Sequence, residues 1–545
     1  MMRKKLVIFL SVVQLFFSNC TAQQRLADYI GEWKGKEANT GDLNIDITLE
    51  PKGENTVFKL SNSKEILTKT FKLENNIALT LADGLTFSGV MSKDKTTING
   101  FIRLQQNLYP TRLRKKGNLY VGKWHLSVLR YLRSNDLRLT LKETNGDEFE
   151  AYPILGTFWC DDFKKEENAI SFKDYKTGLT FKGHLKPSEI LLDISIGKHL
   201  LTTVSYRKAS NNKELNATLS KANPPVNDGW KISSDQLTLK KMEEDIQSDV
   251  LEGTEGVVIA KNSEIIYENY FDGFKATTPH DTRSASKSVS SAIIGIAIDD
   301  NIIEDVEQTI YTYLPNKYQY TKDEKKAKIR IKDLLTMSSG MYISEGQYQE
   351  SDNWLKTVLE APIKHTPGTY TDYQSADPFL LGIYLSSRLD VPLEFYMDNK
   401  LFAPLGITNY IINTDDTETT PYFGGGLHLT PRDMLKFGQL YLNEGSWQGK
   451  QIISKDWVKA SFKKYTRLQD TRDKNEYGYL WWHKSYEVNG KTYNSIEARG
   501  AGGQYIFVIP ALDTVMVITS GNYRNRKTSQ PEKIAQEYIL PVLLD

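Results

Sequence analysis

The sequence predicts a multidomain protein in which two small all-β modules precede a larger domain of mixed helices and strands. Residues up to about 210 contain an internal repeat, residues 209–235 are rich in Asn and Pro, and helix-like and strand-like segments then alternate to the C-terminus. A chain of 545 residues is also too long for a single hydrophobic core. We therefore expect modules at 25–117 and 118–208, a linker at 209–235 and a C-terminal domain at 236–545.

The first residues have the pattern of a signal peptide. Basic residues at 3–5 precede a mostly apolar run at 6–17, which is too short to span a membrane. Two processing routes are open: cleavage after Ala22, or lipid attachment at Cys20, because the four residues ending there resemble a bacterial lipobox. Both routes predict a signal peptide at 1–22 and an exported protein, in the bacterial periplasm or at the outer membrane. The lipid would anchor it to a membrane.

The repeat is visible in short matched segments. Tyr29–Trp33 recurs as Tyr120–Trp124, and Leu85–Gly89 recurs as Leu179–Gly183. Residues 43–50 alternate apolar and polar, which is typical of half-buried antiparallel strands. We expect about seven or eight strands per copy, enough for a small barrel-like module. The Gly-x-Trp opening of each copy weakly resembles the first strand of lipocalin-type barrels, although Trp at these positions is also explained by core packing.

The composition excludes some functions. Lys and Arg number 69 against 68 Asp and Glu, so no basic excess favours nucleic acid as a partner. The two cysteines, Cys20 and Cys160, leave no internal disulfide if Cys20 is removed or acylated. The seven histidines have no metal-ligand spacing, so we expect neither a metal nor a cofactor.

The composition break at 209–235 also predicts that the C-terminal part folds alone.

Ser284 and Lys287 are the candidate nucleophile and its activating group. They stand three apart at the start of an apolar helical run, so one helical turn places both side chains on the same face. A hydroxyl that loses its proton there can attack a carbonyl. The spacing alone is not specific, and context must separate this pair from others. Further Ser-x-x-Lys pairs begin, among other places, at Ser61, Ser92, Ser210 and Ser461.

Three stretches and two connectors provide that context. The stretches are Thr282–Ser288, Thr366–Ser375 and Arg499–Tyr505, and the connectors are Ile331–Met341 and Gly424–Met434. Their order and spacing resemble the serine hydrolases related to class C β-lactamases and penicillin-binding proteins, including esterases and 6-aminohexanoate-oligomer hydrolases of that fold. The match covers about residues 228–545. It implies an α+β domain with an antiparallel sheet flanked by helices and a helical subdomain.

The resemblance also implies roles for individual residues. Ser284 would be the nucleophile, Lys287 a base or an activating cation, and Tyr373 the phenol that shuttles a proton to the leaving group. Backbone N–H groups of Ser284 and Gln504 would hold the oxyanion. The remaining expected substrate-binding residues are Gly502, Gly503, Ser375 and Tyr342. An acyl-enzyme would form and water would then hydrolyse it.

Departures from the family pattern narrow the substrate. The third motif has Ala501 where β-lactamases usually place the Lys or His that grips a carboxylate, and Ser375 replaces an Asn. Arg499 is the obvious substitute cation. A small ester, amide or peptide substrate fits better than a β-lactam.

Two alternative functions stay open at this point. One is a D-amino-acid peptidase or cell-wall enzyme that would use Arg499. The other is a silent scaffold whose β modules bind a ligand. Trp481, Trp482 and Tyr342 could line an aromatic pocket, although core packing explains the two tryptophans equally well.

Overall fold

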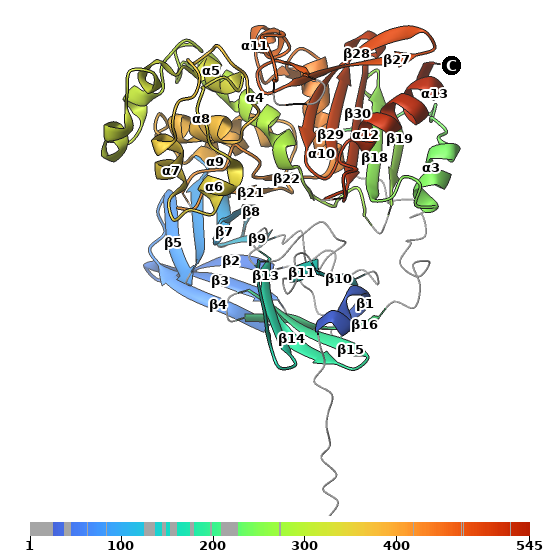
Figure 1. Ribbon diagram of the computed structural model, residues 1–545. Coiled ribbons are helices and arrows are strands. Elements are labelled where there is room, and N and C mark those ends of the chain that lie inside the picture. Colours follow the sequence, from blue (N-terminus) through green and yellow to red (C-terminus); the bar gives the residue numbers. More distant parts are fainter. Residues whose placement is uncertain are drawn as a thin grey trace, which may run out of the picture.

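The structure, a computed structural model, describes most of the chain after residue 25 (Figure 1). The described ranges are 26–37, 45–62, 64–82, 84–124, 137–143, 149–152, 161–174, 179–196, 199–208, 227–271, 274–417, 419–469, 471, 474–523 and 525–544. The expected signal peptide, Cys20, Cys160 and most of the expected linker lie outside these ranges. Within them, no helix combines the length and the apolar character needed to cross a membrane.

The N-terminal part consists of two eight-stranded antiparallel assemblies of like topology. Module 1 contains β2 (Ile45–Lys52), β3 (Asn55–Asn62), β4 (Lys64–Phe71), β5 (Asn76–Ala82), β6 (Leu85–Met91), β7 (Thr97–Leu104), β8 (Asn107–Lys116) and β9 (Leu119–Trp124). Module 2 contains β1 (Gly31–Glu37), β10 (Leu137–Glu143), β11 (Phe149–Tyr152), β12 (Asp161–Glu166), β13 (Ala169–Asp174), β14 (Leu179–Lys186), β15 (Glu189–Ile196) and β16 (His199–Lys208). The short 3-10 helix η1 (Leu26–Tyr29) precedes β1.

The first strand of each sequence repeat pairs within the other module. Strand β1, which carries Trp33, lies between β10 and β16, and β9, which carries Trp124, lies between β2 and β8. Both strands contain the same Gly-x-Trp pattern, at the start of β1 and at the end of β9, so each fits the place that the other would fill, as in domain swapping. Both tryptophans are buried in one apolar cluster shared by the modules. The sheets therefore cross the boundary between residues 117 and 118 that the repeat predicts.

The C-terminal part is an α+β domain built on a nine-stranded sheet. In spatial order its strands are β17 (Lys231–Ile232), β19 (Glu264–Tyr270), β18 (Thr254–Lys261), β30 (Thr514–Ser520), β29 (Gln504–Ile509), β28 (Lys491–Gly500), β27 (Trp482–Val488), β26 (Glu476–Tyr477) and β25 (Thr466–Arg467). A separate hairpin joins β23 (Ser446–Trp447) to β24 (Lys450–Gln451). The central strands β18, β29 and β30 are buried on both faces, because helices cover each side.

One face of this sheet packs against the helices at the two ends of the domain. These are α3 (Lys240–Gln247), α12 (Gln530–Lys533), η8 (Ile534–Ile539) and α13 (Leu540–Leu544). The opposite face packs against a second group of helices, α4 (Ser286–Asp299), α10 (Pro431–Leu442) and α11 (Lys455–Ser461). The helical subdomain comprises α5 (Ile331–Leu335), α6 (Glu345–Gln349), α7 (Trp354–Glu360), α8 (Ala376–Ser386), α9 (Leu393–Met397) and the π-helical turn η6 (Asp398–Phe402). Short 3-10 turns are η2 (Arg283–Ala285), η3 (Tyr311–Tyr313), η4 (Asn316–Thr321), η5 (Lys326–Lys328) and η7 (Pro510–Leu512).

Module 1 and the C-terminal domain share a sheet. The short strands β20 (His280–Asp281), β22 (Leu427–Leu429) and β21 (Ile411–Asn413) continue the sheet of module 1 through β8. Asn413 Nδ2 donates to Asn107 Oδ1 at 2.6 Å, and both residues are buried. Phe101 of β7 packs edge-on against Phe395 with ring centroids 5.0 Å apart. This junction lies below the helical subdomain (Figure 1).

Candidate active site

Helix α4 is the central buried helix of the C-terminal domain, and Ser284 lies in the turn η2 just before it. Arg283 has a positive φ of 49°, which is unusual for a residue with a side chain. Asp281 holds this conformation twice: its Oδ1 accepts the Arg283 backbone N–H at 3.1 Å, and its Oδ2 lies 2.9 Å from the Arg283 Nε. Gly425 lies on another side of this turn, where a Cβ would make ordinary contacts at 3.5–3.8 Å with Arg283 and the Ser284 nitrogen. The nucleophile's turn is thus fixed from two sides.

Lys287 is buried beside Ser284. Its Nζ donates to Ser284 Oγ at 2.7 Å and also to the carbonyl oxygen of Gly424. Burial lowers the pKa of Lys287 to about 8, and the negative charge of Glu345 offsets part of that effect. A substantial fraction of this amine is therefore neutral near pH 8. A neutral amine in hydrogen-bond contact with a serine hydroxyl can take its proton.

Tyr373 lies against the same amine. The Lys287 Nζ is 5.3 Å from the centroid of the Tyr373 ring. Two aromatic rings from the sheet support this tyrosine: Trp482 at 5.0 Å and Tyr477 at 6.3 Å between centroids. The neighbouring residue Gln374 donates from Nε2 to Ser339 Oγ at 3.1 Å, which ties the loop to the connector before it. The structure therefore brings together the three residues that sequence reasoning selected from distant parts of the chain.

The end of β28 forms the opposite wall of the nucleophile's turn. A Cβ on Gly500 would clash with the backbone oxygen of Thr282 and would lie 3.2 Å from the Ala285 nitrogen. The exposed Ala501 follows directly. This places the backbone of a sheet strand next to the Ser284 N–H, the arrangement that an oxyanion site requires.

The expected oxyanion residue Gln504 lies at the start of the next strand, opposite Gly500. Its side chain is fully buried and donates to the Ser520 carbonyl oxygen. Gly502 and Gly503 have φ values of 78° and 91°, and a Cβ on either would clash with Tyr523 or crowd Ser520. These glycines form the turn between the strands, whereas Gly500 packs closely against the turn that carries Ser284. The assignment of an oxyanion donor to Gln504 stays a prediction.

The other expected substrate-binding residues have different surroundings. Ser375 is buried at the residue preceding α8, two positions after Tyr373. The side chain of Tyr342 is 59% exposed, and its ring lies 4.6 Å from the Lys364 ammonium. Trp482 borders Tyr373, but Trp481 is wholly buried in the core beside Phe437. Trp482 therefore borders the group formed by Ser284, Lys287 and Tyr373, whereas Trp481 is a core residue.

The sequence of the C-terminal domain decides the family. The pattern of the family described as Beta-lactamase matches residues 244–538, which is more than half of the chain. The chain belongs to this family. Its C-terminal domain has the β-lactamase-like fold of serine hydrolases that the resemblance implied, and the N-terminal modules lie outside the match.

Individual relatives of this Beta-lactamase-family chain are distant. It is 22% identical over 290 residues to the 6-aminohexanoate-dimer hydrolase of Paenarthrobacter ureafaciens, covering 48% of this chain and 71% of the relative. It is 26% identical over 204 residues to the N-acetylmuramyl-L-alanine amidase of Bacillus subtilis, covering 32% of this chain and 46% of the relative. Several other curated relatives are matched over less than half of their length.

Solved structures of this fold include a family VIII carboxylesterase, with 15% identity, a TM-score of 0.44 and coverage of 53% of this chain and 92% of that one. A penicillin binding protein from Bacillus halodurans has 16% identity and a TM-score of 0.42, with coverage of 55% and 98%.

Arg499, the candidate substitute cation of this family member, is already neutralised. It contacts Glu497 at 2.6 Å and Glu532 at 3.0 Å, and its guanidinium lies 5.1 Å from the Trp482 ring centroid. Glu497 is fully buried, so the pair is shielded from solvent. A guanidinium that already holds two carboxylates is poorly placed to bind a third from a substrate.

Sequence reasoning missed an acidic residue near Lys287, Glu345. A Cβ on Gly424, whose carbonyl oxygen Lys287 contacts, would clash with the hydroxyl of Tyr422. That hydroxyl donates to Glu345 Oε1 at 3.0 Å and contacts the Tyr348 hydroxyl at 2.5 Å. The glycine run was recognised as a connector, but no sequence signal joined Glu345 to it. The negative charge of Glu345, from the helical subdomain, therefore acts on the Lys287 amine.

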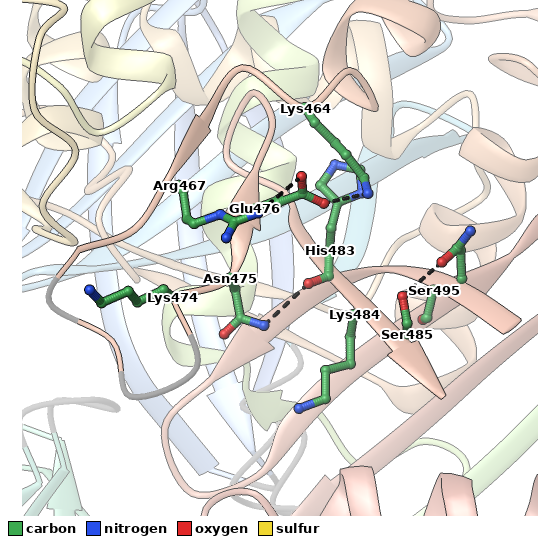
Figure 2. Close-up of a pocket in the computed structure, with 10 residues that line it drawn as sticks. Lys464, Arg467, Lys474, Asn475, Glu476, His483, Lys484, Ser485 and Ser495 are labelled. Carbon is green, nitrogen blue, oxygen red and sulfur yellow. Dashed lines mark hydrogen bonds and ion pairs between the residues drawn. The ribbon is translucent and has the colours of Figure 1, made fainter. Parts of the chain in front are cut away.

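A polar pocket of about 260 Å³ is lined by residues of β25, β26, β27 and β28, including Glu476 and His483, the sequence neighbours of Tyr477 and Trp482 (Figure 2). Glu476 forms ion pairs with Lys464 and, at 3.7 Å, with Arg467, while Lys484 pairs with Glu532 at 3.1 Å. Burial lowers the pKa of His483 to about 4, so the imidazole is neutral at pH 7. Lys464, Arg467 and Lys484 are therefore each paired with a carboxylate. Across the described part of the chain, no three His, Cys, Asp or Glu side chains gather to hold a metal ion.

The contact at Gly500 can be tested directly. We expect Gly500→Ala to lower kcat/KM for p-nitrophenyl butyrate by roughly 10-fold to 10²-fold, because the added methyl group must displace the turn that carries Ser284. The control is Gly346→Ala in the exposed helix α6, where φ is not positive and the nearest atom to an added Cβ is the Glu350 Oε1 at 3.6 Å. Equal rates for Gly500→Ala and the wild type would mean that this strand end does not set the nucleophile's position.

Proposed function

We propose that the protein is an exported serine hydrolase that cleaves a small ester or amide through an acyl-enzyme on Ser284. The observation that carries this proposal is the buried Lys287 amine, 2.7 Å from Ser284 Oγ and with its pKa lowered to about 8. Such an amine is a base poised near its working pH. Membership of a hydrolase family and the position of Tyr373 beside the same amine support the proposal.

The proposed reaction begins when neutral Lys287 takes the proton of the Ser284 hydroxyl. Ser284 Oγ then bonds to the substrate carbonyl carbon, and the carbonyl electron pair moves onto oxygen. The Ser284 N–H and the Gln504 N–H, the second donor that the family resemblance implies, stabilise that oxyanion. When the carbonyl re-forms, the bond to the leaving group breaks, and the Tyr373 phenol supplies its proton and is reprotonated from Lys287. A water molecule hydrolyses the acyl-enzyme by the reverse relay.

The charges around the site favour substrates without a carboxylate next to the scissile bond. Arg499 is held by Glu497 and Glu532, Ala501 replaces the usual cation, and Glu345 adds negative charge beside Lys287. These features speak against a D-amino-acid peptidase that would grip its substrate's carboxylate through Arg499. Export to the periplasm or outer membrane, with a lipid on Cys20 as one route, is part of the proposal and rests on residues 1–22.

A covalent probe tests the proposed nucleophile. We expect a fluorophosphonate to add one equivalent to the folded protein, with peptide mass spectrometry locating it on Ser284. The Ser284→Ala variant should take up none and should hydrolyse no p-nitrophenyl butyrate above background. Labelling that persists in Ser284→Ala, or an absence of labelling and turnover in the wild type, would favour the silent-scaffold alternative. A panel of esters, amides and D-dipeptides on the same pair of proteins would then define the substrate class.

A further inference from the structure

A groove of about 830 Å³ runs along the seam between module 1 and the C-terminal domain. One wall consists of strands β2, β7, β8 and β9, and the other includes Asp398, Ile407 and Thr408. Small-molecule sites commonly have volumes of about 300–1,000 Å³ and often lie between domains. In Figure 1 the strands of module 1 lie directly beneath the helical subdomain that supplies the second wall. None of the residues that line this groove belongs to the catalytic cluster.

The groove opens where β8 leaves the shared sheet. Strand β8 pairs with β21 only at Asn107 and Leu108. From Pro110 to Lys116, its partners among the described strands are β7 and β9. Arg112 and Arg114 are exposed on either side of the buried Leu113, and Lys115 and Lys116 beyond them are exposed as well; of these, Arg112, Arg114 and Lys116 line the groove.

The exposed face of β8 is a ladder of positive charges. Every second residue of a strand points the same way, so these three side chains leave the backbone about 7 Å apart. Arg112 Nε donates to Asn99 Oδ1 at 3.0 Å, which orients its guanidinium within the groove lining. A guanidinium has further N–H donors on its terminal nitrogens, and these suit carboxylate and phosphate oxygens.

The acidic residues of the groove do not cancel this charge. Lys123 lies 3.7 Å from Asp46, so the acid of β2 is matched by a fourth cation. Asp398 accepts the Tyr410 hydroxyl at 2.8 Å on the opposite wall; burial raises the pKa of its carboxyl, and the charge of Arg112 offsets part of that effect, so this acid faces one of the three cations. The lining holds four cationic side chains against these two acids. A net positive groove at a domain seam attracts anions.

We propose that this groove binds a linear anionic ligand with two or more carboxylate or phosphate groups, which Arg112, Arg114 and Lys116 contact in turn. The regular spacing of the three cations fits a chain of charges better than a single ion. The second wall, from Asp398 to Thr408, encloses the ligand against the ladder. Module 1 is then a recognition element fixed to the catalytic domain. The proposal is independent of Ser284 chemistry.

Calorimetric titration of the full chain with trigalacturonate and with tripolyphosphate tests this site. The two probes distinguish carboxylate from phosphate as the source of negative charge. We expect at least one to bind, and the variant Arg112→Ser/Arg114→Ser/Lys116→Ser to weaken its Kd tenfold or more. A matched control, Lys69→Ser/Lys72→Ser/Lys93→Ser, removes the same charge from exposed lysines outside the lining and should change Kd less than twofold. Ser284→Ala should bind as the wild type does.

A second variant separates the groove from a general attraction to a basic surface. Thr408 is exposed on the catalytic-domain wall, so Thr408→Trp fills the groove without removing a charge. We expect it to weaken binding of the same probe at least fivefold, with an unchanged melting temperature. Equal binding by the two triple variants, full affinity in Thr408→Trp, or binding of neither probe by the wild type would overturn the proposal.

Discussion

Replacing Lys287 with Met is expected to lower kcat/KM for p-nitrophenyl butyrate by about 10²-fold to 10⁴-fold, the usual loss when a positioned base is removed. Met has similar length and keeps the buried volume filled, so the helix should remain packed. What disappears is the nitrogen that contacts Ser284 Oγ and the Gly424 carbonyl oxygen. Steady-state kinetics on the variant and the wild type measure the effect.

The pH dependence of the wild type belongs to the same prediction. Burial lowers the pKa of Lys287 to about 8, so the neutral amine becomes the major form above that pH. If the neutral amine is the base, kcat/KM rises with pH below about 8 and levels off above it. The Met variant has no group to titrate at this position, so its residual rate should lack that rise.

Lys464 provides the matched control. It also follows a serine by three residues, Ser461, but its ammonium pairs with Glu476 beside the polar pocket of Figure 2. Lys464→Met should therefore retain kcat/KM within about twofold. A Lys287→Met enzyme that keeps more than a tenth of the wild-type rate, or a wild-type profile that is flat between pH 6 and 9, would remove Lys287 from the role of base.

The grouping of Ser284, Lys287 and Tyr373 could be predicted because short sequence patterns identify each of these residues. Ser284 and Lys287 share a face through helical periodicity, and Tyr373 was located by its place in a motif of fixed order. The position of Glu345 near this group could not be predicted in this way. Glu345 reaches the site only through Tyr422 and the glycine beside it, and that contact depends on how two loops fold together.

The β modules show a different limit of sequence reasoning. The repeat revealed their number and their strand content, but it could not choose a partner for each strand. Strands β1 and β9 contain the same Gly-x-Trp pattern and occupy equivalent positions in the two modules, so the periodic pattern fits either module. The exchange is decided by connections and packing over long range. Arg499 is a similar case, because one of its two acidic partners, Glu532, comes from the C-terminal helix.

Phe101→Ala is expected to destabilise the C-terminal domain by about 3–5 kcal/mol, the usual cost of truncating a buried phenylalanine. Phe101 belongs to module 1, yet its ring packs against Phe395 and Tyr410 of the helical subdomain. Although the composition break predicts independent folding, the shared apolar contact and the β8–β21 pairing make the module part of the domain's support. Thermal unfolding, followed by loss of ester hydrolysis, measures the change.

The control for this prediction is Val90→Ala, since Val90 is 42% exposed and its truncation should leave the melting temperature nearly unchanged. A shortened chain that begins at residue 227 extends the same test, because it removes Phe101 together with the whole of β8. We expect it to melt at a lower temperature than the full chain or to aggregate, as Phe395 and Tyr410 lose their cover. A shortened chain with the full melting temperature and activity would support the prediction of independent folding. It would also show that the contact with module 1 does not stabilise the C-terminal domain.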